Sequence, residues 1–329
     1  MIQRRTWMLR MGAVAALAAC AALSAGPAAA QAYPSKPVRL VVPLTAGSGA
    51  DIVARILGRK LGEMWGQPVM VDNKPGAGGQ IGTREVVRAE ADGHTLLIQS
   101  ASHAANVAMY KSLPYDPLKD LVDVALLAKT PYVMVASAAG PYKSVKEVVE
   151  RSRNKNPGVF FASAGVGTST HLTAELFADK AGVQMTHVPF KGSPDAINDV
   201  AGGNTAFYMA PLPTVSGMLK DGRLVPIGVT SGKRVATLGQ VPTIAESGYP
   251  GFEAELWVGL WAPAGTPPAV LNKLAADVAS ALRSPDVVDQ FAKGGNEAGA
   301  LSPAEFARFV RSEVETNRAL VRKANIPLQ

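Results

Sequence analysis

The stretch "VVPLTAGSGADIVARILG", residues 41–58, indicates a strand–loop–helix unit, because it joins a strand pattern to a helix pattern through a loop of small residues. Apolar residues recur at helical spacing after Asp51, where we expect the helix cap. Glycines let the backbone approach a ligand, and the first N–H groups of a helix have no partner inside it. With the helix dipole, such a junction favours an anion. An ordinary strand–helix turn has the same composition, so this loop alone leaves both interpretations open.

Two common phosphate-binding motifs are absent. The loop reads "GSGADI" at 47–52, without the third glycine of G-x-G-x-x-G, and the chain contains no G-x-x-x-x-G-K-[ST]. The sequence therefore gives no indication of a dinucleotide or nucleoside triphosphate, and we expect no cofactor.

A second loop of the same kind follows a later strand pattern. "FASAGVGTSTHL", 161–172, runs from a strand through glycines into a helix that opens on hydroxyl residues. Two such helix ends at one cleft can hold a carboxylate with N–H groups and hydroxyls, without an arginine. A third glycine-rich stretch, "NKPGAGGQIGT" at 73–83, either lines the cleft or simply turns the chain.

Short strand patterns alternate with helix patterns along the chain, which predicts an α/β fold with largely parallel sheets. The strand patterns lie at 38–43, 69–73, 94–100, 122–128, 132–137, 159–164, 184–190, 206–210, 224–229 and 257–263. The helix patterns lie at 50–64, 79–90, 143–153, 168–181, 193–201, 212–220 and 267–282, and the capping box "SPAE" (302–305) begins a long C-terminal helix.

The alternation runs twice, with turn-rich material at 129–132 and 246–255. We therefore expect two α/β lobes, with the second inserted in the first. Lobe 1 would contain residues 31–131 and 248–329, including the C-terminal helix, and lobe 2 residues 132–247. Because open α/β sheets bind ligands beyond the carboxyl ends of their strands, the ligand should lie in the cleft between the lobes.

Residues 1–30 are expected to be a secretory signal peptide, with N-terminal arginines, an apolar run and "AAA" at 28–30. "RRTWML" also resembles a twin-arginine signal, and "LAAC", which ends at Cys20, is an alternative lipoprotein cleavage site. Each interpretation places the product outside the cytoplasm. No later stretch approaches the roughly 20 apolar residues of a membrane-spanning helix. We expect a periplasmic protein.

Composition narrows the classes of ligand. The formal charge of +7 falls to +4 without the three arginines of the signal, and no basic run is present, so nucleic acid is not an expected partner. A mild positive balance suits an anionic small molecule. Cys20 is the single cysteine, so the mature chain would have neither disulfides nor thiolate metal sites. The spacing of His94, His103 and His187 fits no metal site.

In several blocks the chain resembles the substrate-binding proteins of tripartite tricarboxylate transporters, the Bug family. The blocks begin with "YPSKPVRLVVPLTAGSGADIVARILGRKLGEMWGQPVMVDNKPGAGGQIGT" and continue with "SAGVGTSTHLTAELF", "VPFKGSPDAINDVAGG", "VTSGKRVATLGQVPTIAESGYPGFEA" and "WAPAGTPPAVLNKL". The resemblance implies a two-lobed, periplasmic-binding-protein-like (type II) fold that closes on a small carboxylate. It also implies membrane permease subunits as partners, and we expect a monomer.

The ligand class stays open among di- and tricarboxylates, amino acids and aromatic acids. Ser48 stands where the family often has a glycine, and Ala206 where it often has an acidic residue. "YMAP" at 208–211 is more apolar than the family's usual sequence. These departures make an aromatic or longer carboxylate a plausible ligand.

Twelve residues are the expected ligand-binding set. The resemblance implies Ala46, Gly47, Ser48 and Asp51 in the first loop and Ser163, Gly165, Gly167, Thr168 and Ser169 in the second. Ser100 and Ser102 join the set because they lie at the end of a strand pattern, and His171 because it lies one turn into the helix of the second loop. Some have simpler interpretations: Asp51 as a cap and His171 as a helix-surface side chain. Lys191 either donates to the ligand or is solvated.

We expect no catalytic residue. The mature chain has no cysteine, no G-x-S-x-G elbow and no H-E-x-x-H, and no Ser/His/Asp set surrounds the glycine loops. Binding without turnover is therefore favoured over an extracytoplasmic hydrolase or isomerase. A carboxylate-sensing receptor for a membrane signalling partner would use the same closure as a transport receptor, so the sequence leaves that alternative open.

Overall fold

The chain forms a mixed β-sheet flanked by helices in the computed structural model, which describes residues 33–154 and 158–329. The expected signal peptide, its twin-arginine alternative and Cys20 lie outside the described residues. The strands are β1 (Val38–Val42), β2 (Val69–Asn73), β3 (Thr95–Ser100), β4 (Leu121–Ser137), β5 (Phe160–Ser163), β6 (Thr186–Pro189), β7 (Phe207–Pro211), β8 (Leu224–Val229), β9 (Glu255–Pro263) and β10 (Glu297–Ala298).

The helices follow the expected pattern, with small shifts at their ends. They are α2 (Gly49–Trp65), α3 (Gln80–Val87), α4 (Ser102–Met109), α5 (Val145–Arg153), α6 (Ser169–Ala181), α7 (Ser193–Ala201), α8 (Leu212–Lys220), α9 (Pro268–Arg283), α10 (Pro285–Gly294) and α11 (Pro303–Lys323), with short turns η1 (Ala77–Gly79) and η2 (Ala236–Leu238). The sequence patterns missed α4, α10 and β10. The capping box at Ser302 and Glu305 does begin α11, because each side chain bonds to the other residue's backbone N–H.

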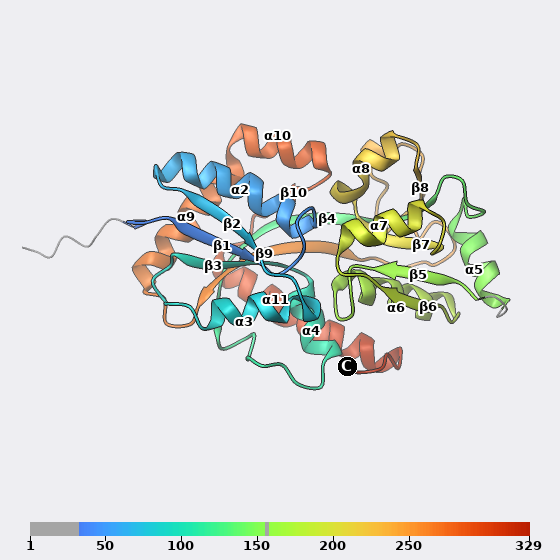
Figure 1. Ribbon diagram of the computed structural model, residues 1–329, viewed down its shortest axis with the longest axis horizontal. Coiled ribbons are helices and arrows are strands. Elements are labelled where there is room, and N and C mark those ends of the chain that lie inside the picture. The colour runs from blue at the N-terminus through green and yellow to red at the C-terminus, as the bar shows by residue number, and fades with distance from the viewer. Residues whose placement is uncertain (1–32, 155–157) are drawn as a thin grey trace, which may run out of the picture. The chain divides into compact units, whose positions relative to one another are not determined.

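The sheet has two groups of parallel strands joined by two long antiparallel ones. β1 pairs in parallel with β2 and β3, and β5 pairs in parallel with β6 and β7. The strand order is β2-β1-β3-β9-β4-β7-β5-β6, with β8 and β10 paired to β4. We call β1–β3 the first part of the sheet and β5–β8 the second part. Figure 1 shows the two parts at opposite ends of β4 and β9.

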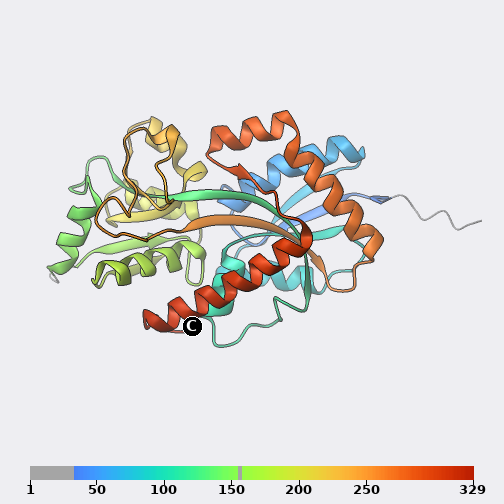
Figure 2. The ribbon, with the colours of Figure 1, turned by 180° about the vertical axis from the view of Figure 1, so that it is seen from behind.

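The segment expected to turn at 129–132 is instead extended, and the prediction of two separate strands there was wrong. β4 pairs with β9 as far as Pro131, opposite Glu255, and from Tyr132 onward it pairs with β7 and β8. A proline lacks only one backbone donor, which a strand tolerates at such a change of partner. Figure 2 shows β4 and β9 side by side along their length, with α11, which packs on α4 and β4, running beside them.

Thr230 links β4 to the residues that lead into β9. Its backbone N–H donates to the Tyr132 carbonyl (3.0 Å), and the Ala254 N–H donates to the Thr230 carbonyl (3.0 Å). Its Oγ1 accepts from the Tyr132 N–H at 3.0 Å. This is the place where the sheet changes from its first part to its second. Lys36–Gln329 form one compact unit, and the division into two lobes that move against each other remains a prediction.

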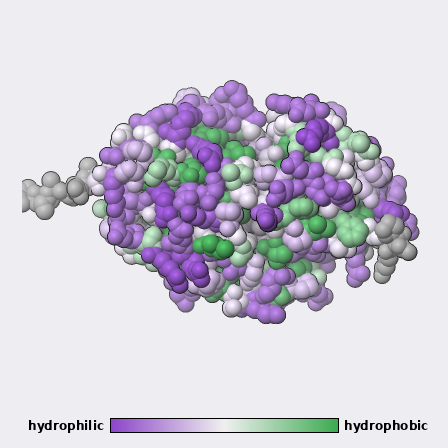
Figure 3. Space-filling view, viewed as in Figure 1, coloured by the Kyte–Doolittle hydropathy of each residue, from purple (hydrophilic) through white to green (hydrophobic). Residues whose placement is uncertain are grey.

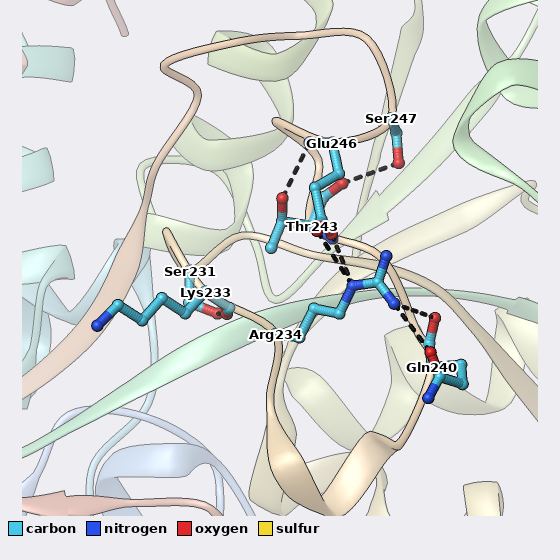
Figure 4. Close-up of polar contacts among 7 residues, drawn as sticks. All are labelled: Ser231, Lys233, Arg234, Gln240, Thr243, Glu246 and Ser247. Atoms are coloured by element: carbon cyan, nitrogen blue, oxygen red, sulfur yellow. Dashed lines mark hydrogen bonds and ion pairs between the residues drawn. The ribbon is translucent and has the colours of Figure 1, made fainter.

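The segment between β8 and β9 is held by its own polar contacts (Figure 4). The Arg234 Nε lies 3.1 Å and 2.9 Å from the two carboxylate oxygens of Glu246. Glu246 and Thr243 also bond reciprocally, since each backbone N–H donates to the other's side chain, at 2.9 Å and 2.8 Å. The hydrogen bond from Arg234 is the main reason that the pKa of Glu246 is lowered. The contacts define the conformation of a segment with little regular structure.

Large apolar and aromatic side chains form the core of the sheet. Phe207, Tyr208, Met209 and Trp261 are completely buried, and Trp257 nearly so. On the face seen in Figure 3, hydrophilic residues predominate and hydrophobic residues form small separate patches. Among the helices in 33–154 and 158–329, none is long and apolar enough to span a bilayer.

Candidate functional site

A cavity of about 620 Å³ lies where the N-terminal ends of α2 and α6 approach each other. Its walls come from loops at the carboxyl ends of strands in both parts of the sheet, where open α/β sheets bind ligands. The lining residues are Pro43, Leu44, Thr45, Ser48, Gly49, Ala50, 75–79, Ser100, Ser102, Tyr110, 164–166, 168–170, 189–193, Asp195, Pro211 and Leu256.

The first loop presents the start of α2 to this cavity. Ser48 is the N-cap, because its Oγ accepts from the Asp51 N–H (3.3 Å), and the helix begins at Gly49. Gly49 and Ala50 are the first helical residues, so their N–H groups have no partner within the helix. Both residues line the cavity.

Asp51 is not the cap that the sequence suggested, because the helix begins two residues earlier. Its carboxylate accepts from the Gly47 N–H (2.8 Å), Arg55 Nε (2.9 Å) and Asn73 Nδ2 (2.9 Å). Burial alone would raise the pKa of Asp51, but these hydrogen bonds outweigh it and hold the pKa below its ordinary value. Asp51 therefore stays ionised beside Arg55 and fixes the loop, without lining the cavity.

The second loop has the same architecture but is fixed by hydroxyls. Thr168 is the N-cap of α6, and its Oγ1 donates to the Gly165 carbonyl at 2.7 Å. The Thr170 Oγ1 accepts from the Ala164 N–H at 3.0 Å. Gly165 adopts φ +127°, a conformation that favours glycine, and its N–H donates to the Ser163 Oγ at 3.0 Å. The loop thus turns its backbone and hydroxyls toward the cavity.

Two stacked histidines support this loop from behind. The rings of His171 and His187 lie 3.7 Å apart at 11°. The Gly167 N–H lies 3.4 Å from His171 Nδ1, and Ser163 Oγ lies 2.6 Å from His187 Nε2. Burial, with the neighbouring His171, lowers the pKa of His187 to about 3, so His187 is neutral near pH 7. The pair positions the loop and does not line the cavity.

The two parts of the sheet touch each other around the cavity. The Ser169 N–H, at the start of α6, donates to the Ser102 Oγ of α4 at 3.0 Å. The Tyr110 hydroxyl donates to the Val166 carbonyl at 3.3 Å. Gly192 packs so closely on Thr45 that a Cβ at position 192 would lie 2.1 Å from Thr45 Oγ1. The cavity is therefore bounded from both sides.

Six of the twelve expected residues line the cavity: Ser48, Ser100, Ser102, Gly165, Thr168 and Ser169. Six do not: Ala46, Gly47, Asp51, Ser163, Gly167 and His171. Ala46 and Gly47 lie on the exposed outer side of the first loop. Gly167 faces Tyr110, and a Cβ there would lie 2.3 Å from the Tyr110 ring. Ligand binding by any of the twelve remains a prediction.

Several residues that line the cavity were not predicted from the sequence. The segment 189–193 runs from the end of β6 to the first residue of α7. Its position at the carboxyl end of a parallel strand could have identified it as part of the site, but the sequence analysis considered only Lys191 within it. The glycine stretch at 73–83 contributes residues 75–79 to the wall, which decides between its two interpretations. Tyr110 and Leu256 carry no local signal, because only the path of the chain brings them to the cavity.

The family model of the tripartite tricarboxylate transporter family receptor matches residues 53–326. The chain belongs to this receptor family. Protein BugT of Bordetella pertussis is 34% identical over 324 residues, which cover 98% of this chain and 99% of the relative. The match spans the loops and both parts of the sheet.

Solved structures of other family proteins confirm the fold. R. palustris Rpa4515 with adipate superposes with a TM-score of 0.87 at 33% identity, covering 90% of this receptor-family chain and 100% of the other. The periplasmic binding protein BugD gives a TM-score of 0.85 at 34% identity, covering 90% and 100%. The expected periplasmic-binding-protein fold is thereby confirmed for this family member.

Proposed function

We propose that this receptor-family protein is a periplasmic solute-binding protein that captures a small carboxylate between the two parts of its sheet. It then delivers the acid to the membrane subunits of a tripartite tricarboxylate-type transporter. It binds without turnover, and none of its residues has a catalytic role.

The observation that carries the proposal is the meeting of two helix N-termini at one cavity. α2 and α6 start in different parts of the sheet, yet Ser48, Gly49 and Ser169 line the same space. The N–H groups of Gly49 and Thr170, which have no partner inside their helices, and the positive ends of both helix dipoles favour an anion there. The related protein with adipate bound supports a carboxylate as that anion.

The same geometry supports closure of the two parts of the sheet on the acid. Only when both parts approach can an acid contact both helix ends, so the acid binds the closed state more tightly and shifts the population toward it. The contacts of Ser169 with Ser102 and of Gly192 with Thr45 are those expected of a closed state. The apolar segment before residue 31 supports a location outside the cytoplasm.

The test combines a thermal-shift screen of small acids with scattering. An acid at one hundred times its Kd should add about 2.7 kcal/mol to the free energy of unfolding. With that acid, small-angle scattering should show a smaller radius of gyration, and the acid should be recovered unchanged at one molecule per chain. An unchanged scattering profile would refute closure, and conversion of the acid would refute binding without turnover.

Ser102→Ala tests the hydroxyl at the junction. The change leaves the Ser169 N–H unpaired and removes a donor from the wall, which costs about 1–3 kcal/mol, or roughly a 5- to 150-fold loss of affinity. Ser312→Ala is the matched control, because Ser312 is exposed on α11, and its affinity should equal that of the wild type. Equal affinity in both variants would exclude Ser102 from the site.

A further inference from the structure

A second cavity, of about 280 Å³, shares a single lining residue, Ser169, with the cavity described above. Its walls come from α4, α6 and α11 and from the strands β4 and β9. A cavity of about 150 Å³ holds benzene, so this one has room for a small organic molecule. Glu253 and Thr316 line it and are exposed, which gives such a molecule a path from solvent.

The charged side chains that line this second cavity are mainly acidic. Glu253, Glu255 and Glu313 stand against one cation, Lys129, which leaves an excess of two negative charges. Burial raises the pKa of Glu255; Lys129 opposes that rise, and the carboxylates of Glu253 and Glu297 add to it. A further cation in the cavity would therefore favour the ionised form of Glu255.

The one lysine of the cavity is directed at an aromatic ring. Its Nζ lies 5.2 Å from the ring centroid of Phe309, and among the described residues no carboxylate oxygen lies within 4.0 Å of it. Because the face of an aromatic ring attracts any cation, the position of Lys129 shows that Phe309 is placed to receive an ammonium group. Trp257, which is buried, extends the aromatic wall.

Hydrogen-bond acceptors in the walls lack donors. Tyr132 is 1% exposed, and its hydroxyl oxygen has no hydrogen-bond partner in the part of the chain that the structure describes. Burial raises the pKa of Tyr132 while Ser169 and Thr173 act in the opposite direction, yet neither hydroxyl is in hydrogen-bonding geometry with it. Glu313 accepts from Trp257 Nε1 at 2.7 Å through Oε2. An ammonium group has three N–H donors and no acceptor, so it matches these oxygens.

The carboxylates are not arranged for a metal ion. Within residues 33–154 and 158–329, no group of three or more Asp, Glu, His or Cys side chains could hold one. The aromatic walls and the acidic charge together favour a cation that carries an apolar body.

The walls of the second cavity belong to both parts of the sheet. α6 follows β5 of the second part, whereas α4 follows β3 of the first part and α11 packs on α4. A molecule that contacts both α6 and α11 therefore fits the arrangement in which the Ser169 N–H bonds to the Ser102 Oγ. Such a molecule would favour the closed state, and by linkage it and the acid would raise each other's affinity by the same factor.

We infer that this second cavity binds a small organic ammonium ion and thereby raises the affinity of the first cavity for its acid. Glu255, Glu313 and Tyr132 supply acceptors for the ammonium N–H groups, and Trp257 and Phe309 contact the apolar body. The ammonium site stands without the proposed function, whereas the coupling rests on the closure in that function.

Isothermal titration with n-butylammonium tests the site, and n-butanol, which has the same chain without the charge, is the control. Butylammonium should bind at one molecule per chain, and butanol at least tenfold more weakly. Absence of butylammonium binding, or equal binding of butanol, would overturn the inference and leave the proposed function untouched.

Three variants locate the ammonium group. Glu255→Gln should weaken butylammonium at least tenfold, and Glu315→Gln, at an exposed glutamate of α11 that does not line the cavity, should leave it unchanged. Lys129→Met should strengthen the binding, because it removes a competing cation from the ring of Phe309. Equal affinity in the two glutamate variants, or weaker binding in Lys129→Met, would overturn the assignment.

The coupling is measured with the acid that gives the largest shift in the thermal screen. Saturating butylammonium chloride should lower the Kd of that acid at least fivefold relative to sodium chloride at the same concentration. Equal Kd values in the two salts would overturn the coupling. A chain that binds butylammonium but no acid would overturn both the coupling and the proposed function, and the ammonium site would stand.

Discussion

Gly192→Ala should weaken ligand binding by opposing closure. Gly192 has extended backbone angles (φ 176°, ψ 178°), so alanine adds no backbone strain there. Its Cβ would lie 2.1 Å from Oγ1, 2.5 Å from Cγ2 and 2.8 Å from Cβ of Thr45. Because the contact involves the root of the threonine side chain, a rotamer change cannot relieve it, and the two parts of the sheet must separate.

The expected magnitude follows from the cost of overpacking. An extra methyl group in a tightly packed contact costs about 1–3 kcal/mol. If that cost falls on the closed state alone, affinity for a bound acid falls roughly 5- to 150-fold, at 1.4 kcal/mol per factor of ten. The free energy of unfolding of the ligand-free protein should change much less, because the open state avoids the contact.

A double-mutant cycle with Thr45→Gly isolates the contact. Thr45→Gly removes all three clashing atoms. Adding Gly192→Ala to the Thr45→Gly variant should therefore cost much less affinity than adding it to the wild type. Titration calorimetry measures the four affinities. Gly217→Ala is the control, because a Cβ there meets nothing within 4 Å. Additive losses in the cycle would show that the alanine blocks the ligand directly, and an unchanged affinity in Gly192→Ala would refute the closure argument.

Two further predictions follow from buried groups. Burial lowers the pKa of His103 to about 4, whereas the unfolded-state pKa is near 6.5. The contribution of neutral His103 to the free energy of unfolding is therefore complete above pH 6.5 and is lost as the pH falls toward 4. The loss at pH 5 is roughly 2 kcal/mol. Urea unfolding should show a smaller loss between pH 7 and pH 5 in His103→Phe, and an equal loss would contradict the assignment. Gly167→Val should weaken acid binding at least tenfold while the chain still folds, because its φ of +76° and the Tyr110 ring exclude a side chain; retained affinity in titrations would show that Tyr110 need not keep its place.

The local architecture of the site was predictable because it depends on residues close together in the chain. Strand, glycine loop and helix start are consecutive in 41–58 and again in 161–172, and both appear where the patterns place them. The N-cap was misplaced by three residues, since Ser48 and Asp51 are both good caps and only the geometry distinguishes them. The continuous strand β4 was missed because a proline at 131 indicates a break, whereas pairing with β9 overrides it.

The roles of individual side chains were less predictable. His171 lies one turn into a helix, a position that suggests either the surface or the cleft. In the structure it is buried and stacks on His187 of β6. Gly167 suggested close approach to a ligand, and its actual neighbour is Tyr110. In each case the deciding partner lies more than ten residues away in sequence.

The α/β alternation, the two helix starts that can attract an anion and the membership of a receptor family were predictable, because contiguous residues carry each of these signals. The three-dimensional packing brings both helix starts to one cavity and places Leu256 and Pro211 against the first turn of α2. It also decided that Gly192 meets Thr45. These contacts join segments up to about two hundred residues apart, and no local preference of the backbone specifies which distant surfaces the folded chain brings together.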